Sequence, residues 1–337
     1  MAYFQLCNIF AKKISRMRIV GLGNALTDVL ARLHSDECFD EMGLLKGGMQ
    51  LIDEEKLLRI MSVFEGLETT LASGGSAANA VSGVARMGIE SGFIGKIGRD
   101  AYGRFFREDM ERNGVQTLLI EGEQASGCAM TMITPDGERT FGTFLGAAAT
   151  LCAEELSADI EGYLVQDTSL ILRAVQLAKE AGLSVSFDMA SYNVVKDNYA
   201  IIRDLVENYV DILFANEEEA LAYTGEEPRK ATEILSRYCR IAVVKCGAQG
   251  SFVGCEGIIT EVPATPEVRV DSTGAGDLYA SGFLYGLSQN CSLGVCGAIG
   301  SLLAGRVIKV IGTKMSDEIW TEIKLKVSSM VAEDIRH

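Results

Sequence analysis

Histidine is the residue whose scarcity excludes the most chemistry in this 337-residue chain. There are two histidines, His34 and the C-terminal His337. A serine–histidine triad, a His-Glu-x-x-His zinc site and a histidine phosphocarrier each need histidines that the sequence does not supply. Any chemistry must therefore rest on carboxylates, backbone dipoles or a metal ion.

Proline, basic residues and paired cysteines are also in short supply. Four prolines and a hydrophobic fraction of 48% indicate a chain that buries a sizeable core without a disordered linker. Because the net charge is −15, neither a nucleic-acid partner nor an anionic membrane surface is expected. Nine scattered cysteines without a Cys-x-x-Cys pair predict reduced thiols in a cytoplasmic protein.

Apolar runs alternate with helix-like stretches along most of the chain. Buried parallel strands are predicted at residues 91–97, 183–189, 210–215 and 241–246. Helices are predicted at residues 49–64, 170–181, 199–208, 229–240 and 292–310. This order predicts an α/β fold with a doubly wound, mostly parallel sheet, whose ligands bind beyond the carboxyl ends of the strands.

Residues 115–150 have a different pattern, with short alternating runs at 118–120, 128–133 and 139–145. A turn at 134–137 separates the last two runs. The segment predicts a β-meander.

The most informative stretch is residues 271–277, with the sequence DSTGAGD. It lies between a strand-like run at 267–270 and a buried helix-like run at 278–287. A glycine-rich turn at a helix N-terminus gathers backbone N–H groups and favours negative charge, so it can cradle an anion. An acid there, Asp277, would repel a phosphate unless it takes the proton of an attacking hydroxyl. The alternative is that Asp277 only caps the helix.

A second glycine motif, SGGSAANA at residues 73–80, leads into another helix-like run. Gly74 and Gly75 allow a polar ligand to approach the backbone, and Asn79 can both donate to and accept from neighbouring hydroxyls. The alternative is a loop whose small residues only ease helix packing.

The opening strand at residues 18–28 contains a Gly-x-Gly pair, but it is not a dinucleotide fingerprint. Leu26 occupies the third glycine position, and no helix-like run follows at once. A carboxylate such as Asp28 can accept two neighbouring hydroxyls of a polyol. The alternative is that Asp28 is a turn residue at the end of the strand.

Another apolar run, at 210–215, is followed by Asn216 and three acids at the start of a predicted helix. The last of these acids, Glu219, lies three residues after Asn216. Acids at a helix start are favoured by the dipole alone, but oxygen ligands around a hydrated ion also suit Mg²⁺. Glu217 and Glu218 remain alternatives to Glu219.

Together these motifs resemble the ribokinase-like, or PfkB, family of carbohydrate and nucleoside kinases. Residues 271–277 match the family's Asp-Thr-x-Gly-Ala-Gly-Asp signature except at Ser272, and residues 74–79 match its Gly-Gly-x-x-x-Asn signature. The resemblance covers nearly all of residues 17–325. It leaves residues 1–16 as an N-terminal extension and 326–337 as a C-terminal tail.

The resemblance implies ATP and Mg²⁺ as cofactors and leaves a monovalent cation open. It implies a small lid formed by segments near 30–50 and 115–150. The anion hole and catalytic base would be Gly274, Ala275, Gly276 and Asp277. The sugar or nucleoside would be bound by Asn24, Asp28, Gly74, Gly75 and Asn79. The nucleotide would be bound by Asn216, Lys245, Gly247, Gly250 and Arg139. The metal would be held, largely through water, by Glu219, Asn216 and Asp271.

The expected activity is ATP-dependent phosphorylation of a primary hydroxyl on a sugar or nucleoside. Among family branches, adenosine-kinase-like members look most similar, whereas Glu161 beside Tyr163 would suit a polar sugar. A fructokinase, a 2-keto-3-deoxygluconate kinase and a non-catalytic ligand-binding regulator remain alternatives. The expected partner is the small-molecule substrate, and the expected state is a monomer or homodimer.

The chain departs from the family pattern at one place. Asp159 joins Ile160 directly, although family members usually have a short loop and a core strand before this point. Either that strand is shortened or a stretch is omitted. Because the strand could border the substrate site, activity is less firmly expected than ancestry.

Overall fold

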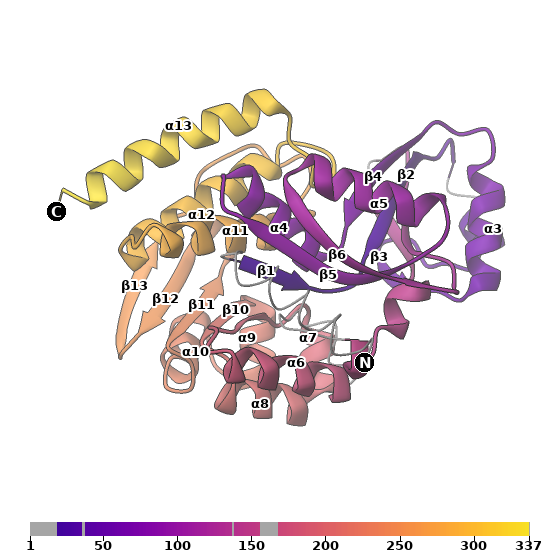
Figure 1. The fold of residues 1–337 in the computed structure, drawn as a ribbon. Coiled ribbons are helices and arrows are strands. Elements are labelled where there is room, and N and C mark those ends of the chain that lie inside the picture. The colour runs from indigo at the N-terminus through magenta and orange to yellow at the C-terminus, as the bar shows by residue number, and fades with distance from the viewer. Residues whose placement is uncertain (1–18, 36–37, 137, 156–167, 337) are drawn as a thin grey trace.

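A computed structural model describes residues 19–35, 38–136, 138–155 and 168–336 of the chain (Figure 1). The segments 1–16 and 159–163, discussed above, lie outside the described residues. The fold is α/β with mostly parallel core sheets, as the sequence predicts.

The core strands form two sheets. The first has the order β1 (Ile19–Leu22), β5 (Ser91–Gly98), β6 (Val115–Gly122), all parallel. The second has the order β13 (Ile258–Val262), β12 (Ser251–Cys255), β11 (Ile241–Lys245), β10 (Ile212–Asn216), β9 (Ser186–Asp188). Its strands β9 to β11 are parallel, and β12 and β13 are antiparallel additions.

The second sheet is buried on both faces, which explains its continuous apolar strands. On β10, Leu213 and Ala215 pack in one hydrophobic cluster, and Ile212 and Phe214 pack in another on the opposite face. One face is covered by α6 (Thr168–Glu180), α8 (Tyr199–Asn208), α9 (Glu217–Thr224) and α10 (Pro228–Leu235). The other is covered by α11 (Ala275–Ser288) and α12 (Leu293–Val307) (Figure 1).

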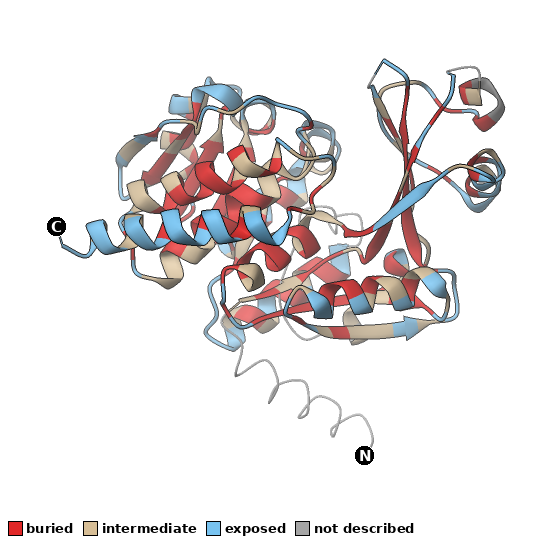
Figure 2. Ribbon diagram, turned by 90° about the horizontal axis from the view of Figure 1, so that it is seen from above, coloured by how far each residue is buried: buried red, intermediate tan, exposed pale blue. Residues whose placement is uncertain are grey.

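Three further helices complete the body of the molecule. They are α4 (Ser76–Arg86), α5 (Ala101–Arg112) and α7 (Tyr192–Asp197). The last described helix, α13 (Asp317–Asp334), projects along the surface and is exposed along much of its length (Figure 2).

A small third sheet stands out from this body (Figure 2). Its order is β3 (Gly48–Leu51), β8 (Arg139–Phe144), β7 (Gly127–Ile133), β2 (Leu26–Arg32), β4 (Thr69–Gly74). The helices α2 (Cys38–Met42) and α3 (Glu54–Phe64) pack on one face, where Val29, Met130 and Ile60 share a hydrophobic cluster. The opposite face includes Asp28, because side chains alternate along a strand.

Four sequence predictions of local structure are wrong. Residues 118–120 belong to β6 in the first core sheet, so the predicted meander reduces to the β7–β8 hairpin. The opening strand is two strands, β1 and β2, in different sheets. The predicted helix at 49–64 begins as strand β3, and α3 starts at Glu54. Residues 267–270 form no strand. In addition, residues 326–334, predicted as a tail, continue α13.

Candidate active site

Polar side chains gather where three parallel strands of the second sheet end. Asp188 ends β9, Asn216 ends β10 and Lys245 ends β11. Ligands of open α/β sheets bind beyond such carboxyl ends. The sequence-predicted turn at 274–276 lies beside them, since a Cβ built on Gly276 would be 3.1 Å from Lys245 Nζ.

The signature turn has a shape that requires glycine at its first position. Gly274 precedes α11 with φ +72°, and a Cβ there would lie 2.4 Å from Thr313 Cγ2. The amide of Ala275 donates to the Ser272 carbonyl at 3.2 Å. The next amides, those of Gly276 and Asp277, belong to the first turn of α11, where N–H groups have no acceptor within the helix. This end of the turn is therefore suited to an anion.

Asp277 and Asn79, predicted from separate motifs, are in direct contact. Asn79 Nδ2 donates to Asp277 Oδ2 at 2.9 Å, and the Thr313 hydroxyl donates to Asn79 Oδ1 at 3.2 Å. Burial raises the pKa of Asp277 to about 6, against the Asn79 hydrogen bond, which lowers it. A carboxyl with this pKa is ionised near neutral pH and remains a usable proton acceptor.

The two glycines of the second motif are required by close approaches between β2, β4 and α4. A Cβ at Gly74 would lie 2.3 Å from Asp28 Oδ1. Gly75 has φ +95°, and a Cβ there would lie 2.4 Å from the Asn24 carbonyl oxygen. The motif therefore brings Asn24, Asp28 and the start of α4 together, and their role in binding a substrate stays a prediction.

Asp28 lies within β2, opposite Ala72 of β4, and not at the end of a strand. Burial raises its pKa to about 7, Lys314 opposes this, and the nearby Asp277 adds to it. Asp28 and Asp277 therefore belong to one electrostatic site.

Lys314 and Asp109 also lie at the candidate site, although no sequence motif predicts either of them. Lys314 Nζ donates to Ser73 Oγ at 2.6 Å and lies 3.1 Å from Asp109 Oδ2. Ser73 Oγ in turn donates to Asp109 Oδ2 at 2.7 Å. This cluster adjoins Gly74 and supplies the cation that faces Asp28. No local motif marks either residue, because the contacts join positions far apart in the chain.

Lys245 forms a partly buried ion pair with Asp188, at 2.7 Å between Nζ and Oδ2. Burial opposes the charge of Lys245, but Asp188 and Glu219 outweigh it, so the net pKa of the lysine is raised. Asp188 was missed in the sequence, although its place as the last polar residue of a predicted strand was a usable signal.

Asn216 and Glu219 hold each other in a capping box at the start of α9. Glu219 N donates to Asn216 Oδ1 at 2.8 Å, and Asn216 N donates to Glu219 Oε2 at 2.7 Å. Burial, together with Asp188, raises the pKa of Glu219 to about 7. The capping alternative thus explains the spacing, and the metal role of both residues stays a prediction.

The donor set fits a Mg²⁺ ion that keeps most of its water. Asp188 and Glu219 crowd negative charge at one edge of the sheet, which a cation would relieve. Much of the hydrogen-bonding capacity of Asn216 and Glu219 is used in the cap, so contacts through water are favoured over direct ligation.

Arg139 and Asp271 join the small sheet to the signature turn. Arg139 Nη1 lies 2.5 Å from Asp271 Oδ2, and Gly312 N donates to the same oxygen at 2.7 Å. The other oxygen accepts from the Thr273 hydroxyl at 2.8 Å. Asp271 is therefore engaged in holding the turn, and its predicted role at the metal remains untested, as does contact of Arg139 with nucleotide.

The glycines of the β11–β12 hairpin differ from each other. Gly250 has φ +97°, and a Cβ there would lie 2.0 Å from the Val262 carbonyl oxygen, so backbone packing alone requires glycine. Gly247 has φ +52° with nothing within 4 Å of a Cβ position. Their predicted nucleotide contacts stay predictions.

The chain is similar over most of its length to known carbohydrate and nucleoside kinases. The model of the pfkB family of carbohydrate kinases matches residues 42–320. A sugar kinase of Archaeoglobus fulgidus is 30% identical over 243 residues, covering 69% of this chain and 96% of that protein. A fructokinase of Klebsiella pneumoniae is 30% identical over 243 residues, covering 64% of this chain and 77% of that protein. The crystal structure of an adenosine kinase from Sinorhizobium meliloti has a TM-score of 0.81 at 33% identity, covering 92% of this chain and 99% of that one.

The family model spans most of the chain and includes both glycine motifs, whereas strands β1 and β2 precede the matched residues. These matches and the paired Asn79 and Asp277 lead to one conclusion: the chain is a member of the pfkB family of carbohydrate kinases.

Proposed function

We propose that this protein transfers the terminal phosphoryl group of ATP to a primary hydroxyl of a nucleoside. The observation that carries the kinase part is the Asn79–Asp277 hydrogen bond, 2.9 Å long, at the start of α11. In support of the proposal, an amide that can bind a hydroxyl, a carboxylate that can accept a proton and a helix start that can bind an anion lie close together.

In this proposal Asp28 and Asn79 hold the sugar hydroxyls, and Asp277 accepts the proton of the attacking hydroxyl. The amides at the start of α11 stabilise charge on the transferred group, and Lys245 adds a positive charge next to Gly276. A bound Mg²⁺ would neutralise charge on the phosphates beside Asp188 and Glu219. The Arg139–Asp271 pair positions the small sheet against the turn, where it would exclude water.

The choice of a nucleoside rests on the face of the small sheet that carries Asp28. Strand pairing aligns Leu30, Thr131, Phe141 and Met49 in a row across four strands. The next row is Asp28, Ala129, Thr143 and Leu51. Both rows lie on the face opposite α3, because paired residues point to the same side of a sheet.

This face combines one carboxylate with a largely apolar surface. Met49 is 51% exposed and Leu51 is 53% exposed, so two neighbouring large apolar side chains on this face are open to a ligand. A free sugar would leave this surface uncovered, whereas a nucleoside offers its hydroxyls to Asp28 and its flat base to the apolar rows.

The proposal is tested by comparing adenosine, ribose, fructose and a 2-keto-3-deoxy sugar acid as acceptors in an assay that measures ADP release. Adenosine should have the highest kcat/KM. Leu51→Ser should lower kcat/KM for adenosine by about tenfold, since one apolar contact is lost. Leu58→Ser, at an exposed position on α3 in the same part of the chain, is the matched control and should leave it unchanged.

Other outcomes separate the alternatives. Faster turnover of fructose or of a 2-keto-3-deoxy sugar acid, with no effect of Leu51→Ser, would replace the nucleoside by a sugar. Binding of a substrate without ADP release would favour the non-catalytic regulator. The cytoplasmic location and the monomeric or dimeric state remain predictions. Among the described residues, no helix is long and apolar enough to span a bilayer.

A further inference from the structure

A short segment between α12 and α13, residues 312–314, contacts three separate parts of the candidate site. Each of its residues donates a hydrogen bond to a different part: Gly312 N to Asp271 at 2.7 Å, the Thr313 hydroxyl to Asn79 at 3.2 Å and Lys314 Nζ to Ser73 at 2.6 Å. The segment therefore joins the signature turn, α4 and the end of β4, which are far apart in the sequence.

The Thr313 hydroxyl holds one end of the Asn79 side-chain amide, and Asp277 holds the other. The ionised carboxylate of Asp277 only accepts hydrogen bonds, so Nδ2 of Asn79 faces it and Oδ1 faces Thr313. Asn79 is 8% exposed and Thr313 is 7% exposed, so water does not readily replace the Thr313 donor. Each end of the amide keeps one further N–H or lone pair, which suits two neighbouring hydroxyls of a ligand.

The remainder of the Thr313 side chain packs on the signature turn. Its Cγ2 lies 2.4 Å from the position that a Cβ on Gly274 would take. Thr313 therefore rests on the turn while its hydroxyl reaches α4. A valine at 313 would keep the branched shape and remove only the hydrogen bond.

Lys314 holds the backbone on which Asp28 rests. Its Nζ contacts Ser73 Oγ and lies 3.1 Å from Asp109 Oδ2, an oxygen that also accepts from N and Oγ of Ser73. The next residue, Gly74, touches Asp28, since a Cβ there would lie 2.3 Å from Oδ1 and 2.5 Å from Oδ2. Lys314 therefore fixes the turn that supports this carboxylate, and its charge opposes the effect of burial on the pKa of Asp28.

Packing alone does not hold these side chains in place. Asn79, Asp109, Thr313 and Lys314 line one cavity of about 330 Å³, so part of the space around them is open. A side chain beside open space has other rotamers within reach. The hydrogen bonds from residues 313 and 314 therefore decide which rotamers are populated.

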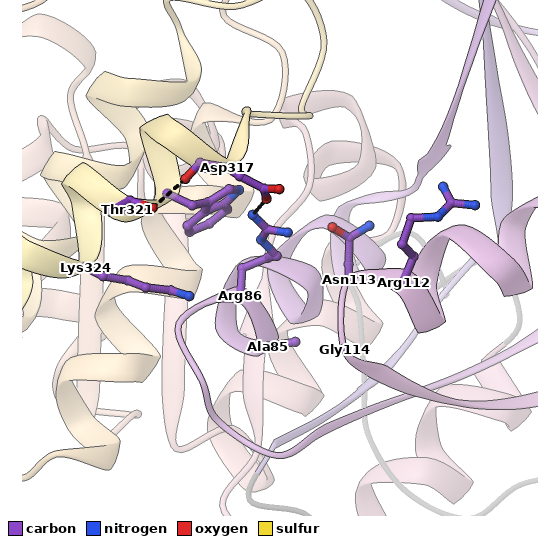
Figure 3. A pocket seen from close by; sticks show the side chains of 9 residues that line it. Ala85, Arg86, Arg112, Asn113, Gly114, Asp317, Thr321 and Lys324 are labelled. Carbon is purple, nitrogen blue, oxygen red and sulfur yellow. Dashed lines mark hydrogen bonds and ion pairs between the residues drawn. The ribbon is translucent and has the colours of Figure 1, made fainter.

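The same stretch of chain also holds the far end of α4. Arg86, in the last turn of that helix, donates to Asp317 at the start of α13, and Figure 3 shows the two side chains pointing toward each other. The Arg86 guanidinium lies 5.5 Å from the centre of the Trp320 ring. Because α4 is attached near both ends to residues 313–320, Asn79 has little freedom to move away from Asp277.

We propose that Thr313 and Lys314 are positioning residues of the candidate site. Thr313 fixes the Asn79 amide, and Lys314 fixes the turn between β4 and α4 beneath Asp28. The inference rests on the proposed function, because it deepens the account of the same site. A segment that only connects α12 to α13 would leave the groups of the site unaffected when these two side chains are changed.

The role of Thr313 is tested in ligand-free protein and with adenosine. In Thr313→Val the side-chain amide protons of Asn79, followed by NMR, should exchange with water at least about fivefold faster. The dissociation constant of adenosine should rise by a similar factor, since one buried hydrogen bond is lost, and that of ATP should not change. Thr313→Ser keeps the hydroxyl and should match the wild type. The matched control is Thr232→Val, which removes a buried hydroxyl on α10.

The role of Lys314 is tested by following the titration of the Asp28 carboxyl carbon by NMR without ligand. Among the described residues, Lys314, Asp277 and the Cys128 thiol face Asp28, and burial raises the pKa of Cys128 to about 12, so the thiol stays neutral. In Lys314→Met the pKa of Asp28 should rise above its wild-type value of about 7, because the opposing charge is lost. The dissociation constant of adenosine at pH 7 should rise about tenfold. Lys314→Arg should restore both quantities, and Lys326→Met, at an exposed position on α13, is the control.

The ligand-free measurements separate this inference from the proposed function. If amide exchange and the Asp28 titration change as expected while the wild type neither binds adenosine nor releases ADP, the positioning roles stand and the proposed function fails. The positioning role of Thr313 is overturned if amide exchange in Thr313→Val equals that in Thr232→Val. The role of Lys314 is overturned if Asp28 titrates alike in Lys314→Met and Lys326→Met. Thr313→Ala and Lys314→Gln are second variants with the same expected directions, for use if either first variant does not fold.

Discussion

The side-chain amide of Asn79 on α4 donates a 2.9 Å hydrogen bond to the carboxylate of Asp277 on α11. The two residues are separated by 198 positions in the chain, and each belongs to a different glycine motif. The bond therefore links the proposed sugar site to the proposed catalytic base.

Replacing Asn79 with Ala should affect both functions of this contact. KM for the nucleoside should rise by about tenfold or more, since one to two buried hydrogen bonds are lost, while KM for ATP should barely change. Because the Asn79 hydrogen bond lowers the pKa of Asp277, the acidic limb of the kcat profile should also move to higher pH. Steady-state kinetics over a pH series measures both effects. An equal loss of affinity for ATP would show that α4 does not line the sugar site.

The pH dependence of the wild type should show two separate breaks. The pKa of Asp277 is raised to about 6, so kcat should fall below that pH as the base becomes protonated. The pKa of Asp28 is raised to about 7, so kcat/KM should begin to fall below about pH 7, where the protonated group accepts hydroxyls less well. Profiles that stay flat down to pH 5 would contradict both assignments.

The Arg139–Asp271 pair should contribute measurably to stability. Arg139→Met leaves the buried Asp271 carboxylate without its cation and should lower the free energy of unfolding by about 3–5 kcal/mol. The double variant Arg139→Met/Asp271→Asn should lose less free energy of unfolding than the two single variants lose together, by at least about 1 kcal/mol. Denaturant unfolding of the four proteins measures this coupling. Strictly additive losses would show that the pair is not an energetic unit.

Glu219→Gln should raise the Mg²⁺ concentration needed for half-maximal rate by roughly tenfold, because a charge beside the hydrated ion is removed. Gln can still accept the bond from Asn216 N, so the cap of α9 should survive. Exposed Glu218→Gln, on the same turn, is the control and should leave the Mg²⁺ dependence unchanged. If the two variants exchange these results, the neighbouring acid faces the metal and Glu219 is only a cap.

Much of the core could be predicted from the sequence because its signals are local. The helix at 199–208 has the predicted bounds, and the buried strand at 241–246 differs from β11 by one residue. Periodic apolar positions and continuous buried runs determine these elements directly. The signature turn at 271–277 is likewise recognisable from its glycines and from Asp277, although its catalytic role stays a prediction.

The small sheet was harder to predict, for identifiable physical reasons. Leu118 lies in an apolar run too short to show whether it pairs in the core or in a meander. Met49 and Leu51 continue the apolar spacing of α3, so β3 was absorbed into a predicted helix. Lys314 and Asp109 enter the site only through contacts between distant segments, which no local pattern records.

Asp277→Asn tests the central claim most directly. The change keeps the size of the side chain but removes the proton acceptor at the start of α11. The unfolding midpoint and the dissociation constants of ATP and nucleoside, measured by calorimetry, should stay near those of the wild type. The rate of phosphoryl transfer should fall by about 10²–10⁴-fold, the usual effect of losing a positioned general base. A near-normal kcat in Asp277→Asn would contradict the account and leave Asp277 as a helix cap.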